Sequence, residues 1–321
     1  MVQVSVIICC YNSQHLIKET LEHLANQDTN DAFDYEVVLV DNNCTDHTVE
    51  VANNVWKALD TTIDLNVVTE SKPGLSYARE TGVKHSKGEF IIFCDDDNWL
   101  ASNYLQIAFD FMLIHPEVGA LGGQSFGELE IDIPDWWDVE KTNYAVGKQA
   151  NKSGNVTKRG YVWGAGIVVR RAILNRLYAA NFKSLLLGRK AEVLSSGDDS
   201  EICLWVILMG YKLWYLEDLK FKHFITKVRL NKNYLKKLKF GHKQSHVVLD
   251  TYRRFYHLIV SNNGYNLKRN QKKKYLKKGI KGFLFNHKFW KEHLQLAFDT
   301  KIKIDSNLYE IIKTYKKVNN L

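Results

Sequence analysis

Long apolar segments are missing from this sequence of 321 residues. The longest near-apolar run, Ile202–Gly210, is far too short to cross a bilayer core of about 30 Å, so we expect no transmembrane helix. The first residues, MVQVSVIICCYN, contain neither a basic leader nor a small-residue cleavage site, so we expect no signal peptide. These absences predict a cytoplasmic protein.

Cysteine is scarce and is not arranged to bind a metal. The five cysteines form no CxxC pair and have no zinc-ligand spacing. Four of the five lie in or beside apolar segments; the set is Cys9, Cys10, Cys44, Cys94 and Cys203. An odd number of cysteines in such positions predicts reduced, buried thiols in a reducing compartment.

Glycine is absent from CCYNSQHL, residues 9–16, where the first predicted strand ends. A nucleotidyltransferase would need a glycine-rich phosphate loop at this point, so the sequence disfavours that class. We find no internal repeat and no low-complexity linker. With 45% hydrophobic residues, the chain is long enough to bury a substantial core.

Charge is divided unevenly along the chain. From Leu219 to the C-terminus there are 26 Lys and Arg against 5 Asp and Glu, whereas the preceding residues carry a net charge of −13. An acidic body with a basic tail suggests a domain that performs chemistry, joined to a segment that meets an anionic partner. A nucleic-acid-binding protein would explain the tail but not the acidic residues at the strand ends.

Strand-like and helix-like segments alternate in the first third of the chain. Near-continuous apolar strands in such an alternation predict a parallel sheet that helices cover on both faces. The expected strands are residues 4–12, 35–43, 63–70 and 88–97, and the expected helices are 13–27, 45–59 and 74–86. Ser13 is the expected N-cap of the first helix.

Polar side chains gather where these strands end. Ligands of such sheets bind beyond the carboxyl ends of the strands, so a site is expected there. The strand ends are Cys10-Tyr11-Asn12, Asp41-Asn42-Asn43, Glu70-Ser71-Lys72 and Asp95-Asp96-Asp97. Three adjacent carboxylates are costly at the mouth of a buried strand unless a cation compensates them, although a solvated acidic turn is an alternative.

The pattern loosens over residues 127–160, which we expect to be a long loop or insertion. Order resumes with a strand and helix in YVWGAGIVVRRAILNRL, and SSGDDSEICLWVILMGYKLWYL predicts an acidic turn, a helix and a further strand. Beyond about residue 230 we expect helices rich in Lys and Tyr. We therefore divide the chain into residues 1–230 and a basic, mainly helical extension, 231–321.

At the level of motifs, the chain resembles the family 2 glycosyltransferases of the GT-A fold. The resemblance covers roughly residues 2–230, with the motifs in family order: VSVIICCYN, VVLVDNNCTDHT, SKPGLSYARETGVKHSKGEFIIFCDDD, GAGIVVRR, GDDSEICLWVILMGYKLWY and HFITKVRL. Cys9 and Cys10 stand where the family usually has Pro or Thr. The resemblance implies an α/β, Rossmann-like, mostly parallel sheet flanked by helices, and an inverting enzyme that uses a nucleotide-sugar donor.

The acidic triplet resembles the DxD motif of that family. Asp97, with Asp95, is the expected ligand of Mn²⁺ or Mg²⁺, which compensates the leaving diphosphate, and Asp96 is expected near the ribose or the donor sugar. His223 resembles a late histidine that completes the metal or diphosphate shell; an ordinary partly buried histidine is the alternative. Arg229 is either a phosphate partner or a surface charge.

Nucleotide-binding residues are expected at the other strand ends. Tyr11, next to Asn12, is expected to stack on the base, Asp41 to accept a hydrogen bond from a ring N–H such as that of uracil, and Asn43 to contact the ribose. Lys72 and Arg79 offer positive charge to the phosphates near a helix N-terminus, or are helix-surface charges.

Inversion requires a base that removes the proton of the acceptor hydroxyl. The family pattern points to Asp199 as that base, with Asp198 and Glu201 as further acceptor-side candidates; helix capping by both aspartates is the alternative. Trp163 and Trp137 are expected either to stack on an acceptor sugar or to belong to the core.

The Lys-rich tail adds a possible membrane contact. Helical spacing would flank a modest apolar stripe with lysines, as in interfacial helices, although a solvated basic surface explains the pattern equally well. The lysines are Lys272, Lys273, Lys274, Lys277, Lys278 and Lys281. The combined expectation is a metal-dependent transferase that moves a sugar, expected to be UDP-linked, to a saccharide or lipid-linked saccharide in bacterial surface polysaccharide synthesis. A catalytically silent sugar-binding subunit with the same fold is the alternative.

Overall fold

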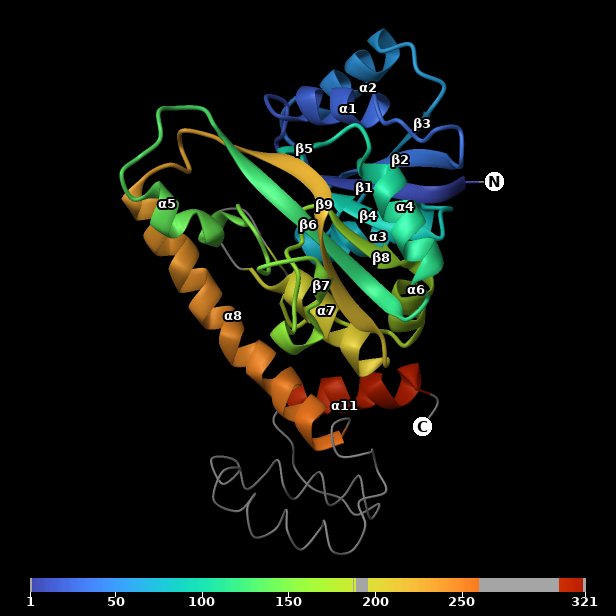
Figure 1. Ribbon diagram of the computed structural model, residues 1–321, viewed down its shortest axis with the longest axis vertical. Coiled ribbons are helices and arrows are strands. Elements are labelled where there is room, and N and C mark those ends of the chain that lie inside the picture. Colours follow the sequence, from blue (N-terminus) through green and yellow to red (C-terminus); the bar gives the residue numbers. More distant parts are fainter. Residues whose placement is uncertain (1, 187, 189–195, 260–305, 320–321) are drawn as a thin grey trace, which may run out of the picture.

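A nine-stranded mixed sheet forms the centre of the molecule (Figure 1). The computed structural model describes residues 2–186, 188, 196–259 and 306–319. The strand order is β3-β2-β1-β4-β8-β6-β9-β5, and β7 pairs with β9. The strands are β1 (Val2–Cys10), β2 (Asp34–Asp41), β3 (Asp64–Thr69), β4 (Phe90–Cys94), β5 (Asn98–Leu100), β6 (Val118–Leu129), β7 (Gly154–Asn155), β8 (Ile167–Arg170) and β9 (Lys212–Ile225).

The expected parallel core of the sheet is confirmed. β1 pairs in parallel with both β2 and β4, so that Ile7 lies between Val38 and Phe93. β8 runs antiparallel to β4 and to β6, and β6 runs parallel to β9. Six strands (β1, β2, β3, β4, β6 and β9) therefore share one direction. Their carboxyl ends meet along one edge, which is where a site is expected.

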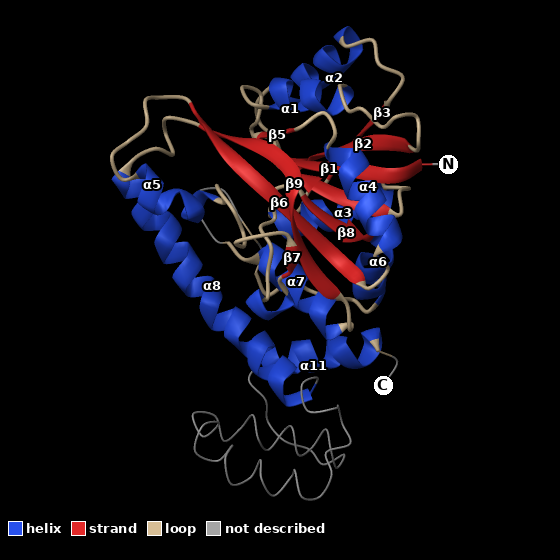
Figure 2. Ribbon diagram, viewed as in Figure 1, coloured by secondary structure: helices blue, strands red, loops and turns tan. Residues whose placement is uncertain are grey.

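Helices cover both faces of the sheet (Figure 2). Successive residues of β1 face opposite sides: Ile7 packs in the cluster under α3, α6 and α7, whereas Val6 and Ile8 pack in the cluster under α1, α2 and α4. The helices are α1 (Ile17–Ala25), α2 (Thr48–Ala58), α3 (Leu75–His85), α4 (Tyr104–Ile114), α6 (Arg171–Ala179) and α7 (Asp198–Leu208). Apolar side chains on both faces explain the near-continuous apolar strands of the sequence.

Two later helices complete the described chain. α8 (Lys232–Ile259) runs along one side of the molecule and meets α11 (Ser306–Val318) at its far end (Figure 1). Tyr252 and Phe255 of α8 pack in the same cluster as Ile311 of α11. None of the described helices is long and apolar enough to span a membrane. The predicted Lys272–Lys281 cluster lies outside the described residues.

Three local features differ from the sequence expectation. Residues 127–160 contain the end of β6 and the short elements α5 (Trp137–Glu140), η1 (Lys141–Tyr144), β7 and η2 (Thr157–Arg159) instead of a continuous loop. β5 is too short to show a periodic pattern. Ser13 does not cap α1, because α1 begins only at Ile17. The Ser13 hydroxyl donates to Asp96 instead.

Candidate active site

A cleft of about 1130 Å³ opens at the carboxyl edge of the sheet. Its volume is slightly above the range that usually holds one small ligand, so it has room for a donor and part of an acceptor. Ten of the residues expected in a site from the sequence line it: Tyr11, Asn43, Arg79, Asp95, Asp96, Asp97, Trp163, Asp198, Asp199 and His223. Strand ends, the start of α7 and one side of α8 form its walls.

The acidic triplet is held in place by hydrogen bonds from several elements. The Ser13 hydroxyl donates to the Asp96 carboxylate, and Thr20 donates to the Asp96 main-chain oxygen at 2.7 Å. Burial and the neighbouring carboxylate of Asp97 raise the pKa of Asp96 to about 7. A cation bound beside the triplet would lower this pKa, because it would stabilise the ionised carboxylates.

Asp97 lies at the centre of a buried cluster of charges. The pairing of β5 with β9 sets Asn98 opposite His223, and this register brings the His223 Nε2 atom to 3.4 Å from the Asp97 carboxylate. Arg229 Nη1 contacts the same carboxylate at 2.5 Å. Arg229 is therefore a buried ion-pair partner of Asp97 rather than a surface charge. Among the residues that the structure describes, His223 Nδ1 and Arg229 Nε and Nη2 are buried and have no hydrogen-bond partner.

The donor set at Asp97 fits a divalent cation only in part. Carboxylate and imidazole are both acceptable to Mn²⁺. Within the described ranges, however, no group of three or more His, Cys, Asp or Glu side chains is arranged to hold a metal ion. Asp97 and His223 can therefore supply two ligands, and the remaining positions would have to come from phosphate oxygens or water.

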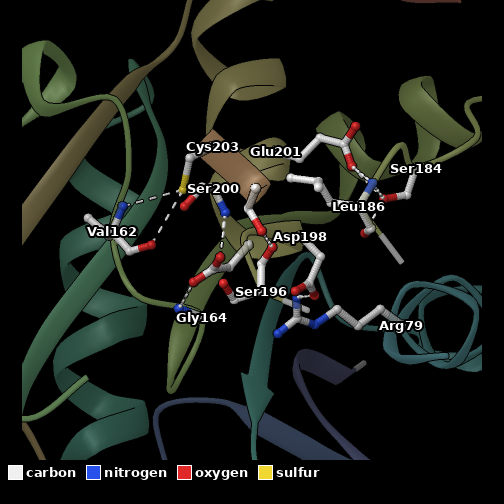
Figure 3. A network of polar contacts seen from close by, with 12 residues as sticks. Arg79, Val162, Gly164, Ser184, Leu186, Ser196, Asp198, Ser200, Glu201 and Cys203 are labelled. Carbon is white, nitrogen blue, oxygen red and sulfur yellow. Dashed lines mark hydrogen bonds and ion pairs between the residues drawn. The ribbon is translucent and has the colours of Figure 1, made fainter. Parts of the chain in front are cut away.

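A second polar cluster lies at the start of α7 (Figure 3). Arg79 of α3 and Asp198 point toward each other and form a buried ion pair, with side chains that are 4% and 9% exposed. The Arg79 guanidinium also lies over the Phe93 ring, 5.1 Å from its centre. The sequence expected Arg79 either at the phosphates or on a helix surface. The structure places it in the cleft wall, where it fixes Asp198.

Asp199 is oriented by two main-chain donors. Its Oδ2 atom accepts a hydrogen bond from the Gly164 N–H at 2.7 Å, and its Oδ1 atom accepts one from Ser200 N–H at 2.7 Å. A Cβ atom at Gly164 would lie 2.8 Å from Asp199 Cβ, so only glycine allows this approach. Burial and the charge of Asp198 raise the pKa of Asp199 to about 6, while Arg79 acts in the opposite direction. The result is a carboxylate that is ionised at neutral pH yet more basic than usual.

The loops at the ends of β1 and β2 leave one aromatic ring open to the cleft. Tyr11 is 49% exposed. The neighbouring Asn12 accepts a hydrogen bond from Thr45 N–H at 2.8 Å, and Asn43 donates to the Ser71 main-chain oxygen at 2.7 Å. Asp41 accepts one from Cys44 N–H at 2.8 Å. These bonds tie the loops together around Tyr11.

Five expected site residues do not line the described cleft: Asn12, Asp41, Lys72, Trp137 and Glu201. Asn12, Asp41 and Lys72 lie beside residues that do. The other two are buried elsewhere. Trp137 packs against Tyr144 at 5.3 Å between ring centres, so its position fits the core alternative.

Glu201 is the other expected site residue that lies outside the cleft lining. The helical turn that directs Asp198 into the cleft directs Glu201 to the segment of Ser184 and Leu186 (Figure 3). Its carboxylate also accepts a hydrogen bond from the Tyr252 hydroxyl of α8 at 2.5 Å. Burial raises the pKa of Glu201 to about 7. These contacts correct the expected acceptor role: Glu201 is a buried side chain that joins three segments.

Several cleft residues had no assigned role in the sequence analysis. Asn42, named there only as part of a strand end, organises the loop before α3, because its side chain donates to the main-chain oxygens of Glu70 and Lys72 and accepts from Gly74 N–H. Other unforeseen residues come from the 142–161 segment and from α8: Lys148, Arg159, Tyr161, His242, Ser245, His246 and Arg253. No motif marks them, because they reach the cleft only through the path of β6, β9 and α8.

A sheet with this order and a cleft at its carboxyl edge define a GT-A glycosyltransferase fold. The sequence profile of Glycosyl transferase family 2 matches residues 5–178, more than half of the chain. The chain therefore belongs to glycosyl transferase family 2.

Curated relatives match over shorter stretches. The poly(ribitol-phosphate) beta-glucosyltransferase of Bacillus spizizenii is 34% identical over 110 residues, which are 34% of this chain and 17% of the relative. The GalNAc(5)-diNAcBac-PP-undecaprenol beta-1,3-glucosyltransferase of Campylobacter jejuni is 32% identical over 105 residues, 33% of each protein. The matched stretches span 17%, 49% and 20% of the first relatives' lengths.

Solved structures share the fold. The structure of S. aureus TarS 1–349 in complex with UDP-GlcNAc has a TM-score of 0.54 at 18% identity, covering 100% of this chain and 84% of that one. The mannosyltransferase PcManGT from Pyrobaculum calidifontis, in complex with GDP-Man and Mn²⁺, has a TM-score of 0.50 at 19% identity, covering 99% and 87%. These likenesses show the GT-A fold.

Proposed function

We propose that the protein is an inverting, metal-dependent glycosyltransferase that moves a sugar from a nucleotide-diphosphate donor to a hydroxyl of a saccharide or lipid-linked saccharide. The observation that carries the proposal is one cleft lined by the acidic triplet, the Arg79–Asp198 pair and Asp199. UDP is the expected nucleotide. The named relatives act on poly(ribitol-phosphate) and on an undecaprenol-linked saccharide, which supports a role in bacterial surface polysaccharide synthesis.

The donor is proposed to lie over the ends of β1, β2 and β4. Tyr11 has the exposed ring that can stack on the base, and Asp41 and Asn43 lie at the end of the neighbouring strand for the ring N–H and the ribose. Asn12 and Lys72 lie beside cleft residues and remain donor-side candidates. Asp96 is proposed to contact the ribose or the donor sugar.

The diphosphate is proposed to lie beside Asp95, Asp97 and His223, which would hold Mn²⁺ or Mg²⁺. The ion, when bound, neutralises negative charge on the leaving diphosphate. Arg229 already neutralises Asp97 as its buried ion-pair partner. Arg229 thus contributes positive charge to the same side of the cleft.

Asp199 is proposed to be the base. Its two main-chain hydrogen bonds fix the carboxylate, and its raised pKa makes it a better proton acceptor than an exposed aspartate. As the acceptor oxygen attacks the anomeric carbon, its proton passes to Asp199 and the bond to the nucleotide diphosphate breaks on the opposite side. Asp198 holds Arg79 through their ion pair, and the Trp163 ring is proposed to stack on the acceptor sugar.

Calorimetric titration with UDP, GDP and dTDP, each with Mn²⁺ and with chelator, tests the donor assignment. We expect one nucleotide to bind tightly in the presence of Mn²⁺, and we expect chelator to weaken that binding. Incubation of the bound donor with candidate acceptors then separates an enzyme from a silent binding subunit, because only the enzyme releases free nucleotide diphosphate. No binding of any nucleotide by the folded protein would contradict the proposal.

A further inference from the structure

Most of the Arg and Lys side chains that line the cleft form ion pairs with carboxylates. Four Arg or Lys residues line the cleft: Arg79, Lys148, Arg159 and Arg253. Three of them form ion pairs, Arg79 with Asp198, Lys148 with Glu217 and Arg253 with Asp250. Among the residues that the structure describes, Arg159 forms no ion pair. Its charge is therefore not compensated by the protein in that part of the chain.

Arg159 is nevertheless held in a fixed position. Its guanidinium lies over the ring of Tyr161, 4.2 Å from the ring centre, and 5.5 Å from the ring centre of Trp163. Its Nη1 atom donates to the main-chain oxygen of Gln149. The described contacts therefore use one of its three nitrogens, whereas a guanidinium has five N–H donors. All three stacked side chains line the cleft.

The buried side chain of Gln149 connects this stack to the proposed base. Gln149 Oε1 accepts a hydrogen bond from Trp163 N–H at 2.8 Å, and Gln149 Nε2 donates to the Gly123 main-chain oxygen at 2.9 Å. Gly164, the residue that follows Trp163, donates its main-chain N–H to the Asp199 carboxylate. The ring of Trp163 and the charge of Arg159 thus belong to the segment that orients Asp199, on the acceptor side.

We propose that Arg159, stacked on Tyr161 and Trp163, is an acceptor subsite that binds an anionic group, a phosphate or a carboxylate, close to the accepting hydroxyl. A planar guanidinium with unused donors suits two oxygens of such a group, and the aromatic rings suit the adjoining sugar or polyol. The inference deepens the proposed function and rests on it for the word acceptor. The inference also explains why Arg159, in a cleft that several aspartates line, forms an ion pair with none of these aspartates.

The probes that test this subsite share one pyranose ring and differ in the group at C6, which is neutral in glucose and anionic in glucose 6-phosphate and glucuronic acid. Each is titrated by ligand-observed NMR into protein saturated with UDP and Mn²⁺, so that the diphosphate position is filled. We expect both anionic probes, or one of them, to bind at least tenfold more tightly than glucose, with a preference that weakens as salt is added. The two anionic probes distinguish a phosphate from a uronic acid.

Three variants assign the preference to the guanidinium. Arg159→Gln is expected to remove the preference for the anionic probe while UDP affinity and thermal stability stay at wild-type values. Arg159→Lys keeps the charge without the planar fork and is expected to retain part of it. Lys158→Gln, an exposed neighbour that does not line the cleft, removes the same charge and is expected to bind like the wild type.

The outcomes separate this inference from the proposed function. Absence of an anionic preference in the wild-type protein, whether all probes bind equally or none binds, overturns the subsite, as does a preference that survives in Arg159→Gln. Loss of nucleotide binding in the first titration overturns the proposed donor chemistry instead. An anionic preference in a protein that binds no nucleotide would leave the anion site standing without the transferase.

Discussion

At the scale of single residues, Asp199 and Asp97 are carboxylates with opposite surroundings. Asp97 is compensated by Arg229 and has His223 at its side, whereas Asp199 has two main-chain donors and a carboxylate neighbour. The first arrangement suits a group that binds charge. The second suits a group that accepts a proton.

Replacing Asp199 by Asn keeps its shape and removes its basicity. We expect Asp199→Asn to fold, to bind the donor with unchanged affinity, and to lose transfer by about 10²–10⁴-fold. Release of nucleotide diphosphate in the presence of acceptor measures transfer, and calorimetry measures donor affinity. Asp138→Asn, at an exposed site that does not line the cleft, is the matched control. Substantial residual turnover in Asp199→Asn would exclude it as the base.

The pH dependence follows from the raised pKa of Asp199. The carboxylate accepts a proton only when it is ionised, and its pKa is about 6. We therefore expect kcat/KM to rise about tenfold per pH unit below pH 6 and to level off above it. Donor affinity measured at the same pH values separates this limb from titration at the acidic triplet. A profile that stays flat from pH 5 to 7 would contradict the assignment.

Replacing Asp97 tests the cation site. Asp97→Ala and Asp97→Asn are expected to lose the Mn²⁺-dependent part of nucleotide affinity, at least tenfold or about 1.4 kcal/mol. Addition of chelator should then weaken nucleotide binding by the wild-type protein but not by the variants. The asparagine variant controls for lost packing beside Arg229. Nucleotide affinity that is unchanged in the presence of Mn²⁺ would argue against this site.

At the scale of elements, α7 directs its acidic residues to two different places. Asp198 and Asp199 meet the cleft, while Glu201 accepts hydrogen bonds from the Ser184 hydroxyl, Leu185 N–H and the Tyr252 hydroxyl. Glu201 therefore joins α7 to α8 and to the segment after α6. Because α8 lines the cleft as well, this connection holds one wall of the site against another.

Removing that connection is expected to cost stability rather than chemistry. Glu201→Ala leaves several buried donors without an acceptor and should lower the free energy of unfolding by about 2–4 kcal/mol. Tyr252→Phe removes a single hydrogen bond and should cost about 1 kcal/mol. Denaturant unfolding followed by circular dichroism measures both. Equal stability of Glu201→Ala and the wild type would show that the carboxylate is not a structural contact.

At the scale of the whole molecule, α8 presents different chemistry on its two sides. Leu238, Ser245 and Leu249 line the cleft. The exposed side carries Phe240 and Val247, which are 62% and 71% exposed, among lysines. These lysines are Lys232, Lys236, Lys237, Lys239 and Lys243. An exposed apolar and cationic face of this kind favours an anionic lipid surface, where each cation contributes about 1 kcal/mol.

We therefore expect the protein to sediment with vesicles that contain anionic lipid, and less so as salt is added. Lys236→Glu combined with Lys237→Glu should reduce the bound fraction several-fold without changing nucleotide affinity. Vesicles of neutral lipid are the control for purely apolar binding. Equal binding to neutral and anionic vesicles, or none to either, would contradict the prediction.

How much the sequence predicts depends on how local the cause is. The alternation of β1 to β4 with α1 to α3, and the polar residues that follow each strand, come from side-chain periodicity and turn chemistry within a few residues. For that reason the parallel core of the sheet was predicted, and Tyr11 and the acidic triplet were correctly expected in one cleft.

Positions set by long-range packing were not predictable in this way. Arg229 lies far along the chain from Asp97, and Arg159 reaches the cleft only through a segment without regular periodicity. Glu201 and Trp137 have residue types that suit an acceptor site, yet helical geometry and packing direct them into the interior.

The sequence by itself determined the family, the strand-end position of the cleft and the acidic residues that line it, because these follow from motifs and periodicities that are local in the chain. Only the tertiary structure decided which charges are compensated. Whether a carboxylate meets Arg79, Arg229 or two main-chain N–H groups depends on the register of β5 against β9 and on where α7 and α8 pack. Those pairings leave Arg159 uncompensated within the described chain, and the burial of Asp199 beside Asp198 raises the pKa of Asp199.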